Sequence, residues 1–174
     1  MDAHDDFPES GLCILDLDSG DEHQLSDSKK YNSGLLLKPH IQWRGKSIFC
    51  LEEAENQIIY GHNMKDGSMF ADLKQYRSEA YFQNHRSIWI YRQGDWQQYV
   101  IFSCYTAREE EMGIYQSHFI SEEEKQTYLK SVESKSLYTT GSQPEITDSL
   151  ITLSTCLGKG KRVIVHAVLL CYTE

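Results

Sequence analysis

Two strand-like segments joined by a short loop dominate the C-terminal end of this sequence. Residues 149–154 form the first segment, and residues 162–172 form a second one that is rich in β-branched side chains. The loop between them, residues 155–161, contains one cysteine and two glycines. Because strands are stable only when they pair, the rest of the chain must supply partners, and a sheet-based fold is predicted.

The remaining segments indicate more strands and at least two helices. A turn at 65–67 precedes Ser68, a plausible N-cap for a helix in which Met69, Phe70, Leu73 and Tyr76 recur at helical spacing. A second helix is predicted over residues 122–134, behind a capping-box pattern that starts at Ser121. The other predicted strands are 34–43, 46–51, 56–60, 87–92 and 96–106, with a hairpin at 93–95. This balance predicts a mostly β protein with a few helices, built as a barrel or closed sheet.

Charge is distributed unevenly along the 174 residues. The net charge is −9, from 17 Lys+Arg and 26 Asp+Glu. Residues 1–28 hold nine of the acids and no Lys or Arg, which leaves 17 charges of each sign in residues 29–174. We therefore predict a poorly determined acidic leader over 1–33 and a neutral domain over 34–174. Neither part offers the basic surface that nucleic acids or anionic membranes require.

Membrane and metal signals are weak in this sequence. Apolar runs fall short of the roughly 18 residues of a spanning helix, and acids stand where a signal peptide would be basic. Neither a membrane anchor nor a signal peptide is therefore predicted in this chain. The five cysteines are odd in number and form no CxxC pair, so at least one thiol is free and no metal or cofactor is predicted.

Three residues stand where a predicted strand meets a loop. His62 follows the strand 56–60, Cys156 follows the segment that ends at 154, and Arg162 opens the last strand. A thiol can act as a nucleophile, an imidazole can transfer protons, and a guanidinium can stabilise an oxyanion. From the residues alone, the chain is a candidate Cys/His/Arg hydrolase or transferase.

Structural roles compete with each catalytic one. The Gly-His-Asn of residues 61–63 also suits a polar turn, and a single arginine such as Arg162 is usually solvated. Cys156 is open to both interpretations, although the neighbouring lysines would favour its thiolate. His166 shares a strand face with Arg162 and is better explained as a hydrogen-bonded strand histidine. The cysteines that lie in mainly apolar surroundings are predicted to be buried and inert: Cys13, Cys50, Cys104 and Cys171.

Three strings of residues, taken together, resemble one known family. Residues 56–70 read NQIIYGHNMKDGSMF, residues 152–156 read TLSTC, and residues 162–167 read RVIVHA. In the same order, these resemble the catalytic-histidine segment, the cysteine motif and the arginine strand of class B sortases. The resemblance extends over about residues 46–169.

The resemblance implies a fold and a reaction. The implied fold is a closed β-barrel of about eight strands with a helix before the Cys-bearing strand, which residues 122–134 would supply. Cys156 would attack the Thr carbonyl of a sorting signal similar to Asn-Pro-X-Thr-Asn and form a thioacyl intermediate. His62 would protonate the leaving amine and later deprotonate the incoming one, and Arg162 would donate hydrogen bonds to the oxyanion. The residues expected to orient the histidine or the substrate are Asn63, Ser154 and Thr155.

The implied partners are a surface protein with a sorting signal and an amine acceptor, which is a peptidoglycan precursor or a pilin. The implied location is the extracytoplasmic surface of a Gram-positive bacterium. Two other functions stay open. One is a Cys/His peptide hydrolase without transfer, for which Asn63 would supply the third polar group. The other is a catalytically inactive β-barrel binding module in which the same side chains are structural.

Overall fold

The structure, a computed structural model, describes residues 12–14, 35–36, 54–65, 67, 70–92 and 95–170. Its strands are β1 (Leu12–Ile14), β2 (Leu35–Leu36), β3 (Asn56–Gly61), β4 (Ser87–Arg92), β5 (Asp95–Arg108), β6 (Leu150–Gly158) and β7 (Lys161–Leu169). Its helices are the 3₁₀ helices η1 (Ala71–Arg77) and η2 (Met112–Tyr115) and the α-helices α1 (Glu79–Asn84) and α2 (Glu122–Ser134). The predicted strand 46–51 and most of the acidic leader lie outside the described residues. The mostly β fold with few helices is confirmed, as is the helix before the Cys-bearing strand.

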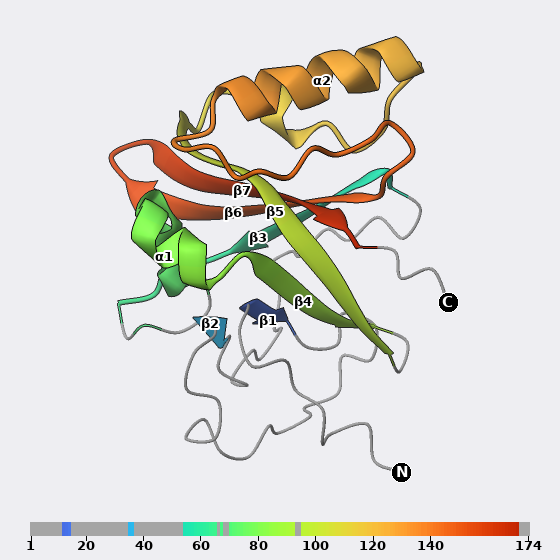
Figure 1. The fold of residues 1–174 in the computed structure, drawn as a ribbon. Helices are drawn as coiled ribbons and strands as arrows, with labels where there is room; N and C mark the ends of the chain where they lie inside the picture. The colour runs from blue at the N-terminus through green and yellow to red at the C-terminus, as the bar shows by residue number, and fades with distance from the viewer. Residues whose placement is uncertain are drawn as a thin grey trace.

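The described strands form one curved sheet with the order β2-β1-β4-β5-β7-β6-β3 (Figure 1). Its centre, β4-β5-β7-β6, is antiparallel, whereas β3 runs parallel to β6 and β1 runs parallel to β4. In the part of the chain that the structure describes, the sheet has seven strands, and β2 and β3 are its edges. β1 lies within the predicted leader and pairs with β4 of the main sheet.

The sheet is covered on both faces, and side chains of β5, β6 and β7 enter two different cores. On one face, η1 and α1 supply Leu73, Tyr76 and Phe82, which pack with β-strand side chains such as Leu153 and Val165. On the other face α2 lies across the sheet (Figure 1). Its residues Tyr128, Leu129 and Val132 are buried with Phe102, Tyr105 and Ile164. Burial on both faces explains why β7 is almost continuously apolar.

The predicted bounds of several elements agree with the structure. α2 spans Glu122–Ser134 as predicted, and the Ser121 side chain accepts a hydrogen bond from the Glu124 N–H at its N-terminus. β3 and β4 agree to within one residue, and β5 pairs with β4 from Asp95 onward. None of the helices in the described residues is long and apolar enough to cross a membrane.

The predicted loop 155–161 is wrong. β6 continues through Cys156 to Gly158, β7 begins at Lys161, and only Lys159 and Gly160 form the turn. Both turn residues have positive φ, 53° and 66°, which is the signature of a two-residue type I′ hairpin turn. Cys156 therefore lies in a paired strand rather than in a loop.

The first predicted helix is also corrected. Ser68, its predicted cap, lies outside the described residues, and the helix begins at Ala71 with Phe70 in the cap position and no side-chain cap bond. It is a 3₁₀ helix rather than an α-helix. Phe70, Leu73 and Tyr76 are nonetheless all buried. Their spacing of three residues matches the 3.0 residues per turn of a 3₁₀ helix, which places them on one face.

Candidate active site

The sequence motifs meet at one end of three neighbouring strands, β3, β6 and β7. Cys156 of β6 pairs in register with Arg162 of β7. The Arg162 guanidinium Nη1 lies 3.7 Å from the Cys156 Sγ and donates to it. The thiol is exposed and the arginine is partly exposed, so the pair borders solvent.

His62 directly follows β3, the neighbour of β6 on the other side. The parallel register pairs Gly61 with Thr155, and its continuation by one residue brings His62 level with Cys156. Adjacent strands lie about 4.8 Å apart, so the structure brings the backbones of these two residues together. The His62 side chain is exposed. His62 thus follows the end of β3 and Arg162 opens β7 next to Cys156, so the three predicted residues lie at the same end of these neighbouring strands.

The turn that carries His62 is fixed by close packing and by hydrogen bonds. A Cβ added at Gly61 would lie 2.3 Å from Phe70 Cγ, so only glycine fits there. The Phe70 N–H donates to the His62 carbonyl at 3.0 Å, which holds Phe70 beside the end of β3. The Asn63 amide donates to the Cys156 carbonyl at 2.9 Å. The Asn63 side chain therefore links the turn that carries His62 to the main chain of β6 at Cys156.

The two residues before Cys156 point to opposite faces of β6. The Thr155 hydroxyl donates to the Gly61 carbonyl at 2.8 Å and links β6 to the end of β3. The Ser154 hydroxyl lies on the same face as Cys156 and is 3.1 Å from the hydroxyl of Tyr115. Both side chains are buried.

Two tyrosines complete the site and were not predicted from the sequence. The ring of Tyr60 lies 5.9 Å from the Arg162 guanidinium carbon and 5.1 Å from the ring of Tyr115. Burial, and secondly the neighbouring Tyr115, raise the pKa of Tyr60 to about 12, although Arg162 acts in the opposite direction. Burial likewise raises the pKa of Tyr115, so both phenols stay protonated at neutral pH. Tyr60 alternates with His62 along the strand, a signal that was available, but Tyr115 is 39 residues from its partner Ser154 and gave none.

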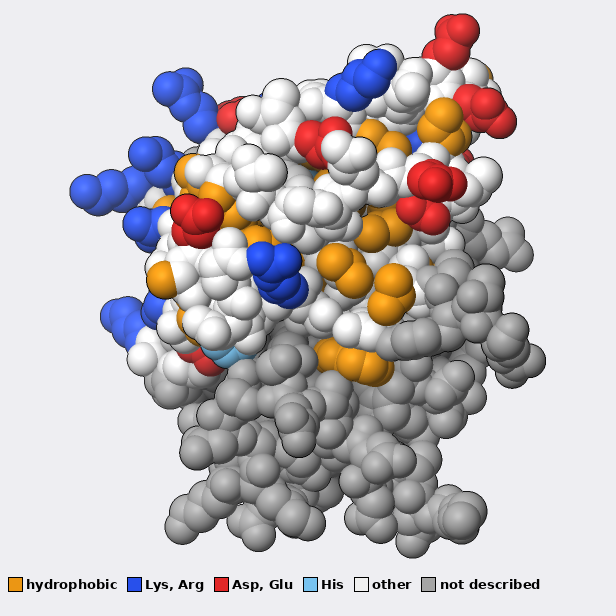
Figure 2. Space-filling model, viewed as in Figure 1, with side chains coloured by type: hydrophobic (Ala, Val, Ile, Leu, Met, Phe, Trp, Pro, Cys, Tyr) orange, Lys and Arg blue, Asp and Glu red, His pale blue; other side chains and the backbone are white. Residues whose placement is uncertain are grey.

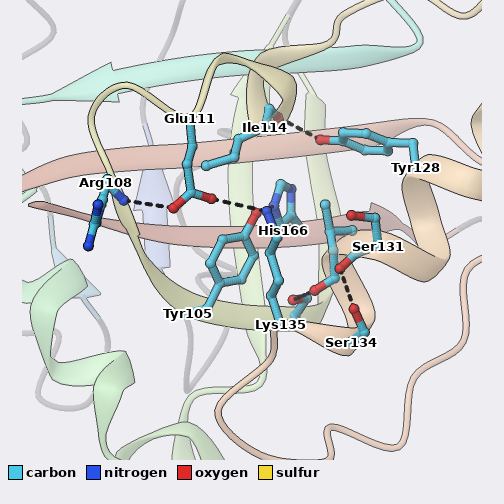
Figure 3. Close-up of polar contacts among 11 residues, drawn as sticks. Tyr105, Arg108, Glu111, Ile114, Tyr128, Ser131, Ser134, Lys135 and His166 are labelled. Atoms are coloured by element: carbon cyan, nitrogen blue, oxygen red, sulfur yellow. Dashed lines mark hydrogen bonds and ion pairs between the residues drawn. The ribbon is translucent and has the colours of Figure 1, made fainter.

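A second histidine and a second cysteine lie in the middle of the sheet. His166 is buried, with its ring nitrogens 3.0 Å from the Tyr105 hydroxyl and 2.9 Å from the Thr152 hydroxyl. Figure 3 shows the His166 ring beside Tyr105. Burial, with a smaller effect of Lys135, lowers its pKa to about 3. Burial raises the pKa of Cys104 to about 12, and its thiol donates to the Tyr76 carbonyl at 3.2 Å. The predictions of a hydrogen-bonded strand histidine and an inert Cys104 are confirmed.

Charge on the surface differs between the two ends of the molecule. Figure 2 shows Lys and Arg side chains gathered on the side where Figure 1 places the β6–β7 turn, and acidic side chains near the opposite end of α2. In the acidic run of residues 109–111, Glu109 and Glu110 are exposed, and Glu111 forms an ion pair with Lys135 at 3.1 Å. Among the described side chains, no group of three or more His, Cys, Asp or Glu residues is arranged to hold a metal ion.

Comparison with known proteins identifies the family. Residues 28–170 match the model of the sortase domain. Sortase B of Listeria monocytogenes is 38% identical over 148 residues, which cover 82% of this chain and 57% of that protein. The structure of Clostridium perfringens sortase B has a TM-score of 0.65 at 30% identity, covering 70% of this chain and 68% of that one. A Staphylococcus aureus sortase B–substrate complex has a TM-score of 0.63 at 25% identity, with coverages of 69% and 57%. The chain thus spans little more than half the length of the Listeria relative.

Proposed function

This chain belongs to the sortase family as a class B member, and from that membership we propose that it is a cysteine transpeptidase with Cys156 as its nucleophile. One observation carries the proposal. The Arg162 guanidinium lies 3.7 Å from the Cys156 Sγ, at a strand end where His62 stands level with the same cysteine. The proposed catalytic domain spans residues 34–174, and the family match over 28–170 supports most of that range.

Acylation of Cys156 would use all three residues. The Cys156 thiol passes its proton to His62, and the sulfur attacks the carbonyl carbon of a Thr, so that a new S–C bond forms and the carbonyl oxygen becomes an oxyanion. Arg162 is held beside the sulfur by the register of β6 and β7, so its N–H groups can donate to that oxyanion. The C–N bond then breaks, and the departing amine takes a proton from His62. The product is a thioester between the substrate and Cys156.

Transfer would reverse the role of His62. An incoming amine loses its proton to the imidazole as it attacks the thioester, and the Cys156 sulfur leaves. The thiol and the imidazole are both exposed, so a second substrate has access to the same strand end. Access to both faces of the thioester is what a two-substrate reaction requires.

The proposed donor substrate is a surface protein with a sorting signal similar to Asn-Pro-X-Thr-Asn. The proposed acceptor is an amine of a peptidoglycan precursor or a pilin, outside the cytoplasm of a Gram-positive bacterium. The Staphylococcus aureus relative was solved as a sortase B–substrate complex, which supports a donor of similar type. The phenol rings of Tyr60 and Tyr115 would form the apolar wall beside the acyl group.

The alternative of a Cys/His hydrolase is less well supported by the geometry. In such an enzyme a carboxamide orients the histidine. The Asn63 amide instead donates to the Cys156 carbonyl, and a guanidinium donates to the Cys156 sulfur. The inactive binding module is disfavoured by the exposure of Cys156, because a purely structural cysteine is usually buried.

The test compares the protein with its Cys156→Ala variant on a fluorogenic Asn-Pro-X-Thr-Asn peptide, with and without triglycine, followed by mass spectrometry. Cys104→Ala is the matched control, because it removes the buried thiol of the same sheet. A transpeptidase gives Cys156-dependent cleavage and a triglycine-linked product. Cleavage that yields only free acid in the presence of triglycine would favour the hydrolase. A lack of cleavage by both proteins would favour the binding module.

A further inference from the structure

The end of η2 and the residues that follow it pass along the face of β6 that carries Cys156. We call residues 114–117 the Tyr115 segment. Its Tyr115 hydroxyl is 3.1 Å from Ser154, two residues before the nucleophile, and its ring packs 5.1 Å from that of Tyr60. The position of this segment therefore decides where one wall of the site stands.

The Tyr115 segment consists of the last two residues of η2 and the two residues after it, and Asn56 binds it from the side of β3. This asparagine, the first residue of β3, is completely buried. Its amide nitrogen donates to the Gln116 carbonyl at 2.9 Å and to the Tyr128 hydroxyl at 3.0 Å. Its backbone N–H donates to the Ser117 carbonyl at 3.1 Å. One residue thus makes main-chain contacts to two successive residues of the segment.

Tyr128 of α2 provides the third attachment. Its hydroxyl donates to the Ile114 carbonyl at 2.8 Å (Figure 3). Burial raises the pKa of Tyr128 to about 12, so the phenol keeps its proton and stays a donor. Because that single proton goes to Ile114, the oxygen is free to accept the hydrogen bond from Asn56.

The orientation of the Asn56 amide follows from its partners. Gln116 offers a carbonyl, which accepts only, so the nitrogen of the amide must face it. The oxygen then faces Thr152, whose hydroxyl donates to it at 2.8 Å. With its proton used, Thr152 can only accept from His166 Nδ1–H, and His166 Nε2 accepts from the Tyr105 hydroxyl. Each N–H and O–H in this series of hydrogen bonds donates to one acceptor. The donors all point the same way, from Tyr105 of β5 towards the Tyr115 segment.

We propose that Asn56 and Tyr128 are positioning residues that hold the Tyr115 segment against β6 and so set the affinity for the donor peptide. The inference rests on the transpeptidase function proposed above. Cys156, Arg162 and His62 are placed by the ladders of β6 with β7 and β3, independently of the segment. Loosening the segment therefore weakens peptide binding and leaves the chemical step intact.

The test compares Tyr128→Phe with Ser103→Ala. Each variant loses one buried hydroxyl that donates to a main-chain carbonyl, that of Ile114 at 2.8 Å or that of Val132 in α2 at 2.6 Å. Only the first loss touches the Tyr115 segment. We expect Tyr128→Phe to raise KM for the peptide about tenfold with kcat unchanged, and Ser103→Ala to change neither. Equal KM values in the two variants, or a fall confined to kcat, would overturn the proposal.

Two further measurements separate this proposal from the function on which it rests. Peptide Kd is measured in the Cys156→Ala background, where no turnover is needed, and Tyr128→Phe is expected to raise it by the same factor. Amide hydrogen exchange of residues 114–117 is expected to accelerate in Tyr128→Phe and not in Ser103→Ala. Tyr115→Phe is a milder change at a partly exposed site. The effect on KM of the double variant with Tyr128→Phe should be smaller than the two single effects combined. An enzyme that cleaves no peptide disproves the transpeptidase, whereas unchanged Kd and exchange disprove the positioning role.

Discussion

The middle of the sheet and its open end hold the same pair of reactive residue types in opposite surroundings. In the middle, Cys104 and His166 are buried, hydrogen-bonded and shifted in pKa so that both are neutral over the physiological range. At the open end, Cys156 and His62 are exposed, and Arg162 lies beside the thiol. The presence of a cysteine and a histidine is therefore not enough to indicate a catalytic site. What distinguishes the two regions is whether these side chains are buried or exposed to solvent.

The physical cause is the cost of charge in an apolar interior. Cys104 would have to ionise away from water, and His166 would have to gain a proton among the rings of Tyr105 and Phe102. Closer to the turn between β6 and β7, solvent and the Arg162 guanidinium are available to Cys156. β6 and β7 therefore carry a buried, neutral histidine in the middle of the sheet and an exposed thiol and guanidinium near their shared turn.

The largest expected difference between the two regions is in thiol reactivity. We expect iodoacetamide at neutral pH to alkylate Cys104 at least about 10³-fold more slowly than Cys156, because Cys104 must wait for the sheet to open. Peptide mapping by mass spectrometry separates the two rates and also distinguishes the remaining cysteines. In denaturant the two rates should converge. Comparable rates in the native protein would break the comparison.

The next effect concerns the arginine at the open end. We expect Arg162→Lys to lower kcat for the sorting peptide by about 10²-fold, because an ammonium lacks the planar fork that directs N–H groups at an oxyanion. The melting temperature should stay close to that of the parent, because the side chain is partly exposed. Arg77→Lys, on the surface of η1, is the matched control and should keep full activity. Near-parental turnover by Arg162→Lys would remove the arginine from the mechanism.

The burial of His166 in the middle of the sheet should make the free energy of unfolding depend on pH. The pKa of His166 falls from 6.5 in the unfolded chain to about 3 in the folded one, so the unfolded chain binds the proton first. Its contribution is complete above pH 6.5 and is lost as the pH falls towards 3. The free energy of unfolding therefore falls as the pH falls through that window, by on the order of 1 kcal/mol per pH unit. The charged or titratable groups that face it are Tyr105, Tyr128 and Lys135.

Urea unfolding between pH 4.5 and 7 measures that slope. Carboxylates add to it in every variant, so the informative quantity is the difference between variants. We expect His166→Gln to flatten the slope, even though it lowers stability at pH 7 by breaking the bonds to Tyr105 and Thr152. His118→Gln, at an exposed position, is the control. Parallel slopes for the parent and His166→Gln would show that the middle of the sheet is not as dry as its burial indicates.

Local signals made part of this architecture predictable. The bounds of α2 follow from the Ser121 cap and three acidic residues in the first turn, which stabilise the helix within a few residues of chain. The strand alternation and the motif residues also predicted that His62, Cys156 and Arg162 lie near strand ends. These features depend on neighbours in the sequence, so the sequence displays them directly.

The remaining features depend on contacts between distant parts of the chain. Asn56 and Tyr128 are 72 residues apart, and nothing near either residue indicates that they meet. The extension of β6 through Cys156 was missed because Gly158 and Gly160 are typical of a broad loop. Pairing with β7 instead compresses that loop to two residues. Tertiary pairing overrode local propensity at the one turn that sets the distance between the cysteine and the arginine.

The smallest predicted effect concerns the turn between β6 and β7, which lies next to Cys156 and Arg162. Lys159 has a φ of 53°, in the left-handed region that a type I′ turn requires and a lysine disfavours. We expect Lys159→Asn to raise the free energy of unfolding by about 0.5–1 kcal/mol, because asparagine tolerates this conformation. Activity should stay within twofold, because the register that pairs Cys156 with Arg162 is already set. Thermal unfolding together with peptide turnover measures both. A gain in stability with a loss of turnover would mean that catalysis needs the hairpin to flex.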